Sequence, residues 1–455
     1  MKTRMNFKDE FYQKLKLLVL PIAIQNFMLA LVSATDAIML GWIDQTSLSA
    51  VSLAGQVQFV LSLFISGIAA GAGIMAAQYW GKQDAASIEK VIPIALRTNL
   101  LFSGLFTILA GFCPEILMRI FTNDAALVAS GSQYLRAVAL SYVLCGISQV
   151  YLILLKNTGH AAVSSRISST AVVLNIILNA ILIYGLCGAP ALGIRGAAYA
   201  TVAARVVELI WAYLETKKPE RVRILWNRLF SSAGKILSED FWRYTLPVLA
   251  ASLVWGIAYV LYSVIMGHMG SDAVAANSIT SIAKSLLSCL IRGVSGGAGV
   301  LIGNLLGANE LEKAREYGGR LSHLSIAIGI VTGGLLMLIS PAIVHFAPLS
   351  DTAAEYLQYM LLFCGLNLMA QSVNTTVLDG IFCAGGDAKF DMQGNIGAMW
   401  CFSVPLGFLA AFWLKLPVMV VYCIVNLDEI VKLPAVYHHY KKYIWVRNIT
   451  RDVED

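Results

Sequence analysis

Runs of about 20 apolar residues, separated by short polar stretches, recur along the whole chain of 455 residues. A helix needs roughly 20 such residues to cross the hydrocarbon core of a bilayer. The pattern therefore predicts an all-α polytopic membrane protein. Twelve transmembrane helices are expected, at residues 17–40, 51–79, 92–112, 134–155, 165–186, 193–214, 244–269, 273–306, 319–341, 352–384, 394–413 and 416–433.

The composition agrees with this reading, because 58% of the residues are hydrophobic, 13% are charged, and the mean hydropathy is +0.71. Soluble domains carry about 25% charged residues. The net charge of +6 comes from loops, and no basic patch with interleaved aromatic residues stands apart from the apolar runs. We therefore expect no nucleic-acid partner.

Basic residues are concentrated in one of the two sets of loops that lie on opposite sides of the membrane. Only about three lie in the loops that follow odd-numbered spans, namely Arg119, Arg195 and Lys415. The other loops hold most of the remainder, including Lys82, Lys90, Lys156, Arg166, Lys313, Arg315 and the stretch 217–243. By the positive-inside rule, both termini are expected in the cytoplasm, with the protein in a bacterial inner (cell) membrane.

An internal repeat appears when the chain is shifted by 226 positions. The matching pairs are Leu20 and Leu246, Pro21 and Pro247, Gly41 and Gly267, Gly67 and Gly293, Gly71 and Gly297, Gly73 and Gly299, and Gly81 and Gly307. A repeat of six helices predicts two lobes of the same orientation, related by a pseudo-two-fold axis along the membrane normal. We expect an N-lobe at 1–220, a cytoplasmic linker at 221–243 and a C-lobe at 244–455. Rocking of two such lobes gives alternating access to a central cleft.

Asp36 is the only charged residue in the apolar stretch 20–41. A carboxylate at membrane depth costs roughly 2.5–3.5 kcal/mol on insertion scales, so such groups usually face a cavity or a partner. One interpretation is a cation or proton site inside a transporter. The other is a residue near the helix end that is wetted by the interface.

No catalytic motif is present, so we expect no enzyme. The chain lacks a GxSxG elbow, a Walker glycine loop and an HExxH helix. Its eight cysteines are scattered, without metal-binding spacing. Packed thiols are expected, with a bridge between Cys113 and Cys187 as the alternative.

Several segments resemble the multidrug and toxic compound extrusion (MATE) family. They are LPIAIQN and TDAIMLG in the first span, GAGIMAAQYWGKQD closing the second, LGIRGAAYAT opening the sixth, AVAANSI and LIGNLLGANELEKA flanking the eighth, GIFCAGGDAKF ending the tenth and NLDEIVKLPAVYHHYKKYIWVRNIT at the end of the chain. The resemblance implies a monomeric antiporter that exports bulky organic solutes in exchange for H⁺ or Na⁺, with no other cofactor and with lipid as its surroundings. Flippases for lipid-linked glycans share the superfamily architecture and are the alternative, which would fit an amphipathic anionic substrate.

The resemblance also implies a cation or proton site in the N-lobe, at Asp36, Asn175, Asn179 and Thr201. The two asparagines are four residues apart and so share a helix face. Oxygen ligands of this kind suit a hard cation such as Na⁺. The same pocket could instead hold a proton on Asp36.

The C-lobe departs from the family pattern. The span 244–269 has no acid, and Tyr262 stands where the repeat places the counterpart of Asp36. Lys284, Arg292 and Asp379 are charged residues within apolar spans. They predict an internal salt-bridge cluster that gates the cleft, a site for an anionic or zwitterionic substrate, or side chains that snorkel to the interface.

Further polar residues complete the candidates. Gln58, the repeat counterpart of Lys284, and Asn26 join Tyr262 as substrate or gating candidates. Arg205 and Glu208 are three residues apart and are expected to pair with each other. Asp428 and Glu429 are expected at the membrane interface.

Overall fold

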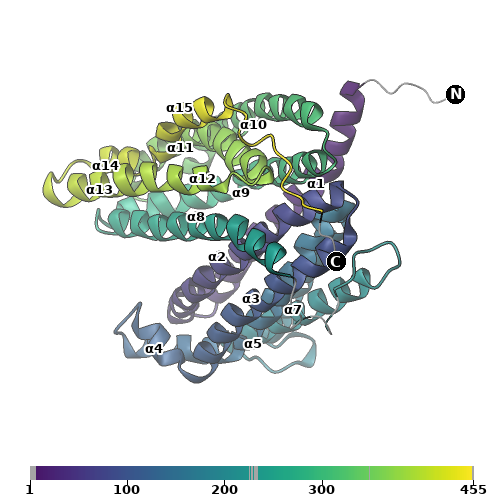
Figure 1. Ribbon diagram of the computed structural model, residues 1–455. Coiled ribbons are helices and arrows are strands. Elements are labelled where there is room, and N and C mark those ends of the chain that lie inside the picture. Colours follow the sequence, from purple (N-terminus) through teal and green to yellow (C-terminus); the bar gives the residue numbers. More distant parts are fainter. Residues whose placement is uncertain (1–6, 225, 227–228, 230–233, 348, 453–455) are drawn as a thin grey trace. The chain divides into compact units, whose positions relative to one another are not determined.

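The computed structural model describes residues 7–224, 226, 229, 234–347 and 349–452, and these residues form helices and connecting turns without any strand (Figure 1). Among these described residues, ten stretches are long and apolar enough to cross a membrane. One of them, Ala125–Tyr184, is two helices joined by a turn, and the last expected span is present as two shorter helices. The prediction of a twelve-span, all-α fold is confirmed.

The first half of the chain supplies six long helices. They are α1 (Phe7–Gly41), α2 (Gln45–Gly81), α3 (Ala85–Phe112), α5 (Ala125–Leu155), α6 (Ala161–Tyr184) and α7 (Ile194–Thr216), with a short α4 (Pro114–Arg119) between α3 and α5. The turn η1 (Lys156–His160) separates α5 from α6, and Gly159 at φ 82° reverses the chain there. A positive φ suits glycine because it has no Cβ.

The second half repeats the order with more broken helices. It contains α8 (Lys235–Gly267), α9 (Ser271–Gly307), α10 (Leu311–Phe346), α11 (Asp351–Thr375), α12 (Ala388–Asn395), α13 (Val404–Phe408), α14 (Val418–Val425) and α15 (Asp428–Tyr440). The π-helical segments η4 (Thr376–Phe382), η5 (Ile396–Ser403) and η6 (Leu409–Trp413) continue α11, α12 and α13. Such wide turns occur frequently at functional sites.

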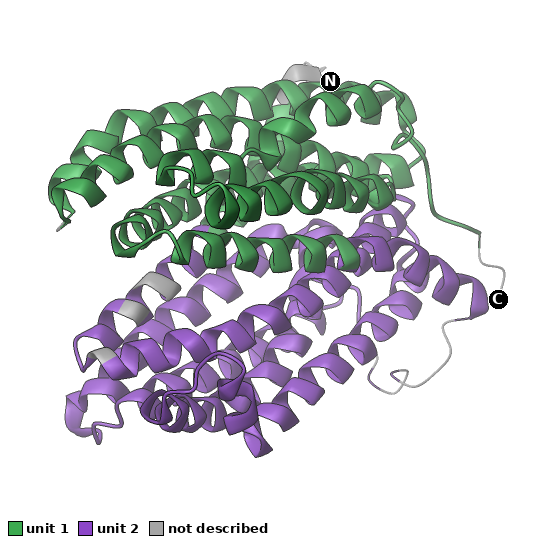
Figure 2. Ribbon diagram, turned by 90° about the vertical axis from the view of Figure 1, so that its left-hand side faces the viewer, with its two compact units in different colours: residues 1–26, 250–452 green, residues 27–249, 453–455 purple. Residues whose placement is uncertain are grey.

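The chain forms two compact units (Figure 2). Unit 1 combines residues 1–26 with residues 250–452, and unit 2 is built from residues 27–249. The expected lobes divide the chain in the linker 221–243, whereas these units divide it inside α1 and inside α8. The amino-terminal part of each of these two helices therefore belongs to the unit formed by the other half of the sequence. The expected symmetry axis concerns the placement of the two halves and stays a prediction.

Glycine residues on α9 and α2 explain why the amino-terminal parts of α1 and α8 pack with the other half of the sequence. In unit 1, a Cβ added to Gly293 of α9 would lie 2.6 Å from the Cβ of Ala23, and one added to Gly297 would lie 2.8 Å from Cγ2 of Val19. Only glycine permits helices to approach so closely. The amino-terminal part of α1 consequently packs against α9.

In unit 2, glycines of α2 make the equivalent close contact with the amino-terminal part of α8. A Cβ on Gly67 of α2 would lie 2.8 Å from the Cα of Leu249, and one on Gly71 would lie 2.6 Å from the Cβ of Thr245. These four residues are the 226-position counterparts of those in unit 1. The repeat detected in the sequence is thus also a repeat of backbone packing.

A carboxyl-terminal segment after α15 is built into unit 1. Trp445 is fully buried, and Arg447 donates from Nε to the carbonyl of Gly385 at 2.7 Å and from Nη2 to that of Gly386 at 2.6 Å. Asn448 donates to the carbonyl of Gly307 at 3.4 Å. This segment therefore ties the turn after α9 to the turn before α12.

Candidate functional sites

Asp36 lies in the part of α1 that belongs to unit 2, where its side chain is partly buried. Asn179 of α6 donates from Nδ2 to Asp36 Oδ1 at 2.5 Å. No lysine, arginine or histidine of the described part of the chain forms an ion pair with this carboxylate. The structure thus places Asp36 against α6 rather than at a fully exposed helix end.

The other predicted residues extend this contact into a row. The same Nδ2 of Asn179 also donates to Asn175 Oδ1 at 3.3 Å. Asn175 donates from Nδ2 to Thr201 Oγ1 of α7 at 3.3 Å, and Thr201 donates to the carbonyl of Ala197 at 3.0 Å. Three helices of unit 2 therefore bring together the four residues that the family resemblance implied.

One oxygen in this row lacks a partner. Asn179 is fully buried, and its Oδ1 accepts no hydrogen bond from the described residues. A buried polar atom without a partner costs free energy, typically 1–3 kcal/mol. Together with the carboxylate of Asp36 and the oxygens of Asn175 and Thr201, it forms an oxygen-rich pocket with one formal negative charge. Such a pocket suits a monovalent hard cation or a proton.

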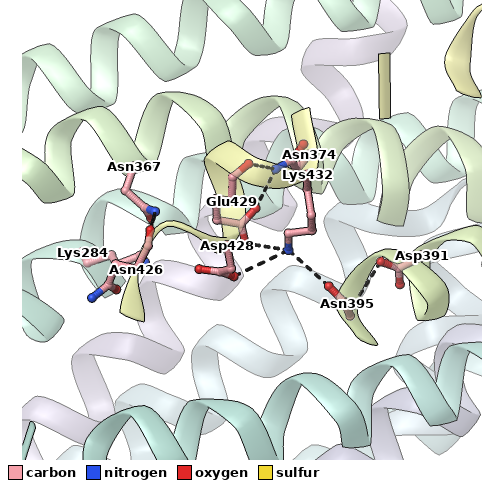
Figure 3. A network of polar contacts seen from close by, with 9 residues as sticks. All are labelled: Lys284, Asn367, Asn374, Asp391, Asn395, Asn426, Asp428, Glu429 and Lys432. Carbon is pink, nitrogen blue, oxygen red and sulfur yellow. Dashed lines mark hydrogen bonds and ion pairs between the residues drawn. The ribbon is translucent and has the colours of Figure 1, made fainter. Parts of the chain in front are cut away.

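In unit 1, the three charged candidates do not form one cluster. Lys284 of α9 donates to Asn367 Oδ1 of α11 at 3.0 Å, and Asn367 donates to the carbonyl of Asn426 at 2.6 Å (Figure 3). Arg292 and Asp379 are both exposed. No ion pair joins any two of the three within the described residues, although Arg292 interacts electrostatically with Asp379. Which of the three interpretations holds for these charges stays a prediction.

A different charged cluster lies near the end of the chain. The ammonium of Lys432 is 3.2 Å from Glu429 Oε1, 3.2 Å from Asn395 Oδ1 and 3.7 Å from Asp428 Oδ2. The three charged residues are 5–9% exposed. Asp428 and Glu429 are therefore enclosed by unit 1 rather than exposed on its surface, and their depth relative to the membrane interface stays a prediction.

Two asparagines connect this cluster to its surroundings (Figure 3). Asn374 of α11 donates from Nδ2 to the backbone carbonyl of Glu429 at 2.6 Å and to its Oε2 at 2.8 Å. Asn395 donates from Nδ2 to Asp391 Oδ1 at 3.2 Å. Sequence reasoning missed Lys432 and both asparagines. The sequence signal that could have revealed the cluster is the spacing of Lys432, which follows Glu429 by three residues and Asp428 by four and so lies on the same helix face.

The expected pair of Arg205 and Glu208 on α7 is confirmed. Arg205 Nη1 lies 3.0 Å from both carboxylate oxygens of Glu208, which is 1% exposed. Ser148 of α5 donates a further hydrogen bond to Glu208 Oε1 at 2.6 Å. This ion pair of unit 2 joins a buried carboxylate to a partly buried guanidinium.

The remaining candidates lie apart from the row that contains Asp36, although Tyr262 is close enough to Asp428 and Glu429 to interact with them electrostatically. Tyr262 is 8% exposed and belongs to an apolar cluster in unit 1. Asn26, also in unit 1, donates to the carbonyl of Ile22 on its own helix at 2.9 Å. Gln58 lies on α2 of unit 2, where it has no hydrogen-bond partner among the described residues. None of the three joins the row that contains Asp36.

Comparisons with known proteins agree on the class of the molecule. The model of the MatE family matches residues 21–181 and 247–409. The uncharacterized transporter YisQ of Bacillus subtilis is 21% identical, over 94% of this chain and 93% of its own. The probable multidrug resistance protein NorM of Thermotoga maritima is 23% identical, over 90% and 87%.

Solved structures of transporters share the fold. A MOP superfamily transporter from Pyrococcus furiosus superimposes with a TM-score of 0.85 at 19% identity, over 95% of each chain. The Vibrio cholerae MATE transporter VcmN, solved as a variant, gives a TM-score of 0.87 at 14% identity, over 96% of this chain and 99% of its own. The likeness covers nearly the whole chain in both cases.

Proposed function

The chain belongs to the MATE family of membrane transporters, and on that premise we propose that it is a secondary antiporter. It exports organic solutes, such as drugs and toxic compounds, in exchange for H⁺ or Na⁺. It resides in a bacterial inner membrane as a monomer with both termini in the cytoplasm. The probable multidrug resistance proteins among its relatives support export of foreign compounds.

The row of Asp36, Asn179, Asn175 and Thr201 is the observation that carries this proposal. It contains a carboxylate that pairs with no cationic group of the described residues, next to a buried amide oxygen that accepts no hydrogen bond from them. A coupling cation or proton would neutralise the carboxylate and give the amide oxygen a partner at the same time. Since the polar groups come from α1, α6 and α7, a small shift of α1 against the other two helices would change the cation affinity. Differential affinity between two states is what lets an ion drive a conformational change.

Transport in reconstituted vesicles tests the proposal. A pH gradient and a sodium gradient are imposed separately, and efflux of a fluorescent organic cation is followed. One of the two gradients should drive efflux by the wild type, and Asp36→Asn should abolish it. Glu115→Gln, at an exposed carboxylate of unit 2, is the matched control and should transport normally. Equal transport by Asp36→Asn would remove this pocket from the mechanism.

One observation favours a second candidate, a flippase or exporter for an amphipathic anion. Lys284 is bonded to an amide, and neither it nor Arg292 forms an ion pair with a carboxylate of the described chain. Transport of an anionic lipid-like dye by the wild type, lost in Lys284→Gln/Arg292→Gln, would support this function. Unchanged dye transport by the double variant would exclude a role for the two basic residues.

A further inference from the structure

The Lys432 ammonium in unit 1 occupies a cage of oxygen atoms. Glu429 Oε1 and Asn395 Oδ1 both lie 3.2 Å from Nζ, and Asp428 Oδ2 lies 3.7 Å away. Two of these oxygens come from α15, and the third comes from α12, so two separate helices enclose the charge (Figure 3). Each of the three oxygens belongs to a residue that is less than a tenth exposed.

The cage is held in shape by residues that do not touch the ammonium. Asn374 fixes Glu429 by donating to its backbone carbonyl and to its Oε2. Asn395 is oriented by the bond from its Nδ2 to Asp391, which turns its Oδ1 toward Lys432. The oxygens of Glu429 and Asn395 are therefore positioned by the fold rather than by the flexible lysine side chain.

Charge in this region is closely balanced. Asp428 and Glu429 contribute two negative charges, Lys432 contributes one positive charge, and Lys284 acts electrostatically on both acids from α9. Asp391 and the exposed Asp379 face the same region, and Arg292 acts on Asp379. Without the ammonium of Lys432, two buried carboxylates would share one cationic neighbour, which is strongly unfavourable.

The Asp36 pocket of unit 2 has similar chemistry with one difference. It also combines a carboxylate with asparagine oxygens, but no ammonium or guanidinium of the described residues is paired with it. A carboxylate and amide cage recurs in both units, and only the cage of unit 1 contains a cation supplied by the chain.

We propose that the cage of Asp428, Glu429 and Asn395 is a second monovalent-cation site, whose ligand is the tethered ammonium of Lys432. Removal of this side chain exposes a site for a free ammonium or small primary alkylammonium ion. In the intact protein the site does not exchange its cation. If the protein is the antiporter proposed above, ion coupling is then confined to Asp36. Only this last statement rests on the proposed function.

Thermal unfolding of the full-length protein in lipid nanodiscs tests the site without measuring transport. Lys432→Ala should unfold at a lower temperature than the wild type. Its Tm should rise by several degrees, and saturate, as ammonium or methylammonium is added at constant ionic strength. Tetramethylammonium, which donates no N–H hydrogen bond, should give no such rise. Ligands that bind only the folded state raise its apparent stability in this saturable way.

Lys284→Ala is the matched control, because its ammonium contacts an amide and lies outside the cage. All variants of this comparison also carry Asp36→Asn, which removes the other candidate cation site, and Lys284→Ala should then show no saturable response to ammonium. Lys432→Ala/Glu429→Gln should lose the response, since it lacks the nearest carboxylate. An equal response in Lys284→Ala, or none in Lys432→Ala, overturns the proposal.

A second variant covers the case in which Lys432→Ala does not fold. Lys432→Ala/Asp428→Asn restores the wild-type charge balance and keeps the two oxygens at 3.2 Å. It should fold and should gain stability from ammonium. Asp36→Asn with Lys432 intact should show no saturable response to ammonium or Na⁺. A response that persists in Asp36→Asn would mean that the cage exchanges its cation, and this too overturns the proposal.

Discussion

Ser148 and Asn374 lie 226 residues apart, and each donates a hydrogen bond to a buried glutamate on the last helical segment of its half. Ser148 contacts Glu208 at 2.6 Å, and Asn374 contacts Glu429 at 2.8 Å. Each glutamate also pairs with a cation three residues away, Arg205 or Lys432. The two halves thus share a hydrogen-bond donor at equivalent positions, whereas the glutamate and its cation stand at positions that the repeat does not relate.

Removing the donor in the second half should destabilise the protein. Asn374→Ala leaves Glu429 without two hydrogen bonds, and a loss of about 1–3 kcal/mol is expected because the group is buried. Thermal unfolding in nanodiscs measures this loss. Ser278→Ala removes a hydroxyl that bonds only its own helix at an exposed position, and it should unfold like the wild type. An unchanged Tm for Asn374→Ala would contradict the role of this bond.

Breaking the ion pair of α7 should cost more than replacing it. Glu208→Ala leaves the largely buried guanidinium of Arg205 without its partner, and the expected cost approaches the roughly 3–5 kcal/mol of a broken buried pair. Arg205→Met/Glu208→Leu removes both charges and should recover most of that stability. The same unfolding assay on the two variants measures the difference. A double variant less stable than Glu208→Ala would show that the pair itself is strongly stabilising.

Side chains on the glycine faces should disturb the packing of α1 and α8. Gly297→Val places atoms where Val19 already lies, and overpacking of this kind costs about 1–3 kcal/mol. Gly71→Val should act similarly against Thr245. Gly55→Val on the same helix α2 is the control, since a Cβ there meets nothing within 4 Å. Equal stability of Gly55→Val and Gly71→Val would refute the close approach.

Asn179 should set the affinity of the Asp36 pocket. Asn179→Leu removes a hydrogen bond to a charged group, which is worth about 1.5–3 kcal/mol. The half-saturating concentration of the coupling ion for efflux should therefore change by roughly ten-fold or more. Thr35→Val, next to Asp36 but bonded to its own helix, is the control and should leave this concentration unchanged. A shift of equal size in both variants would point to a general disturbance of α1.

The carboxyl-terminal segment should contribute to the stability of unit 1. Trp445→Ala empties a fully buried site, and such substitutions cost about 3–5 kcal/mol. Ile444→Ala, at a residue that is 45% exposed, should cost far less. Unfolding temperatures and resistance to proteolysis of the two variants measure the contrast. Equal behaviour would mean that the segment is only loosely attached.

The sequence by itself determined the class of fold and the repeat. Apolar runs of bilayer length predicted the spans, because a lipid-facing backbone must satisfy its hydrogen bonds within a helix. A constant offset through Gly67, Gly71 and their counterparts predicted the two halves. Local pairing was also readable, since Arg205 and Glu208 are neighbours on any helix.

Only the tertiary structure decided which polar groups meet across helices. Lys284 found Asn367, which is 83 residues away, instead of Asp379, and Lys432 found Asn395 from another helix. Helical periodicity fixes the face on which a side chain lies, but the crossing of two helices decides its partner. The burial of Asp428 and Glu429 has the same origin. An acid near a helix end is exposed or enclosed according to what packs over it, and the packing partner lies elsewhere in the chain.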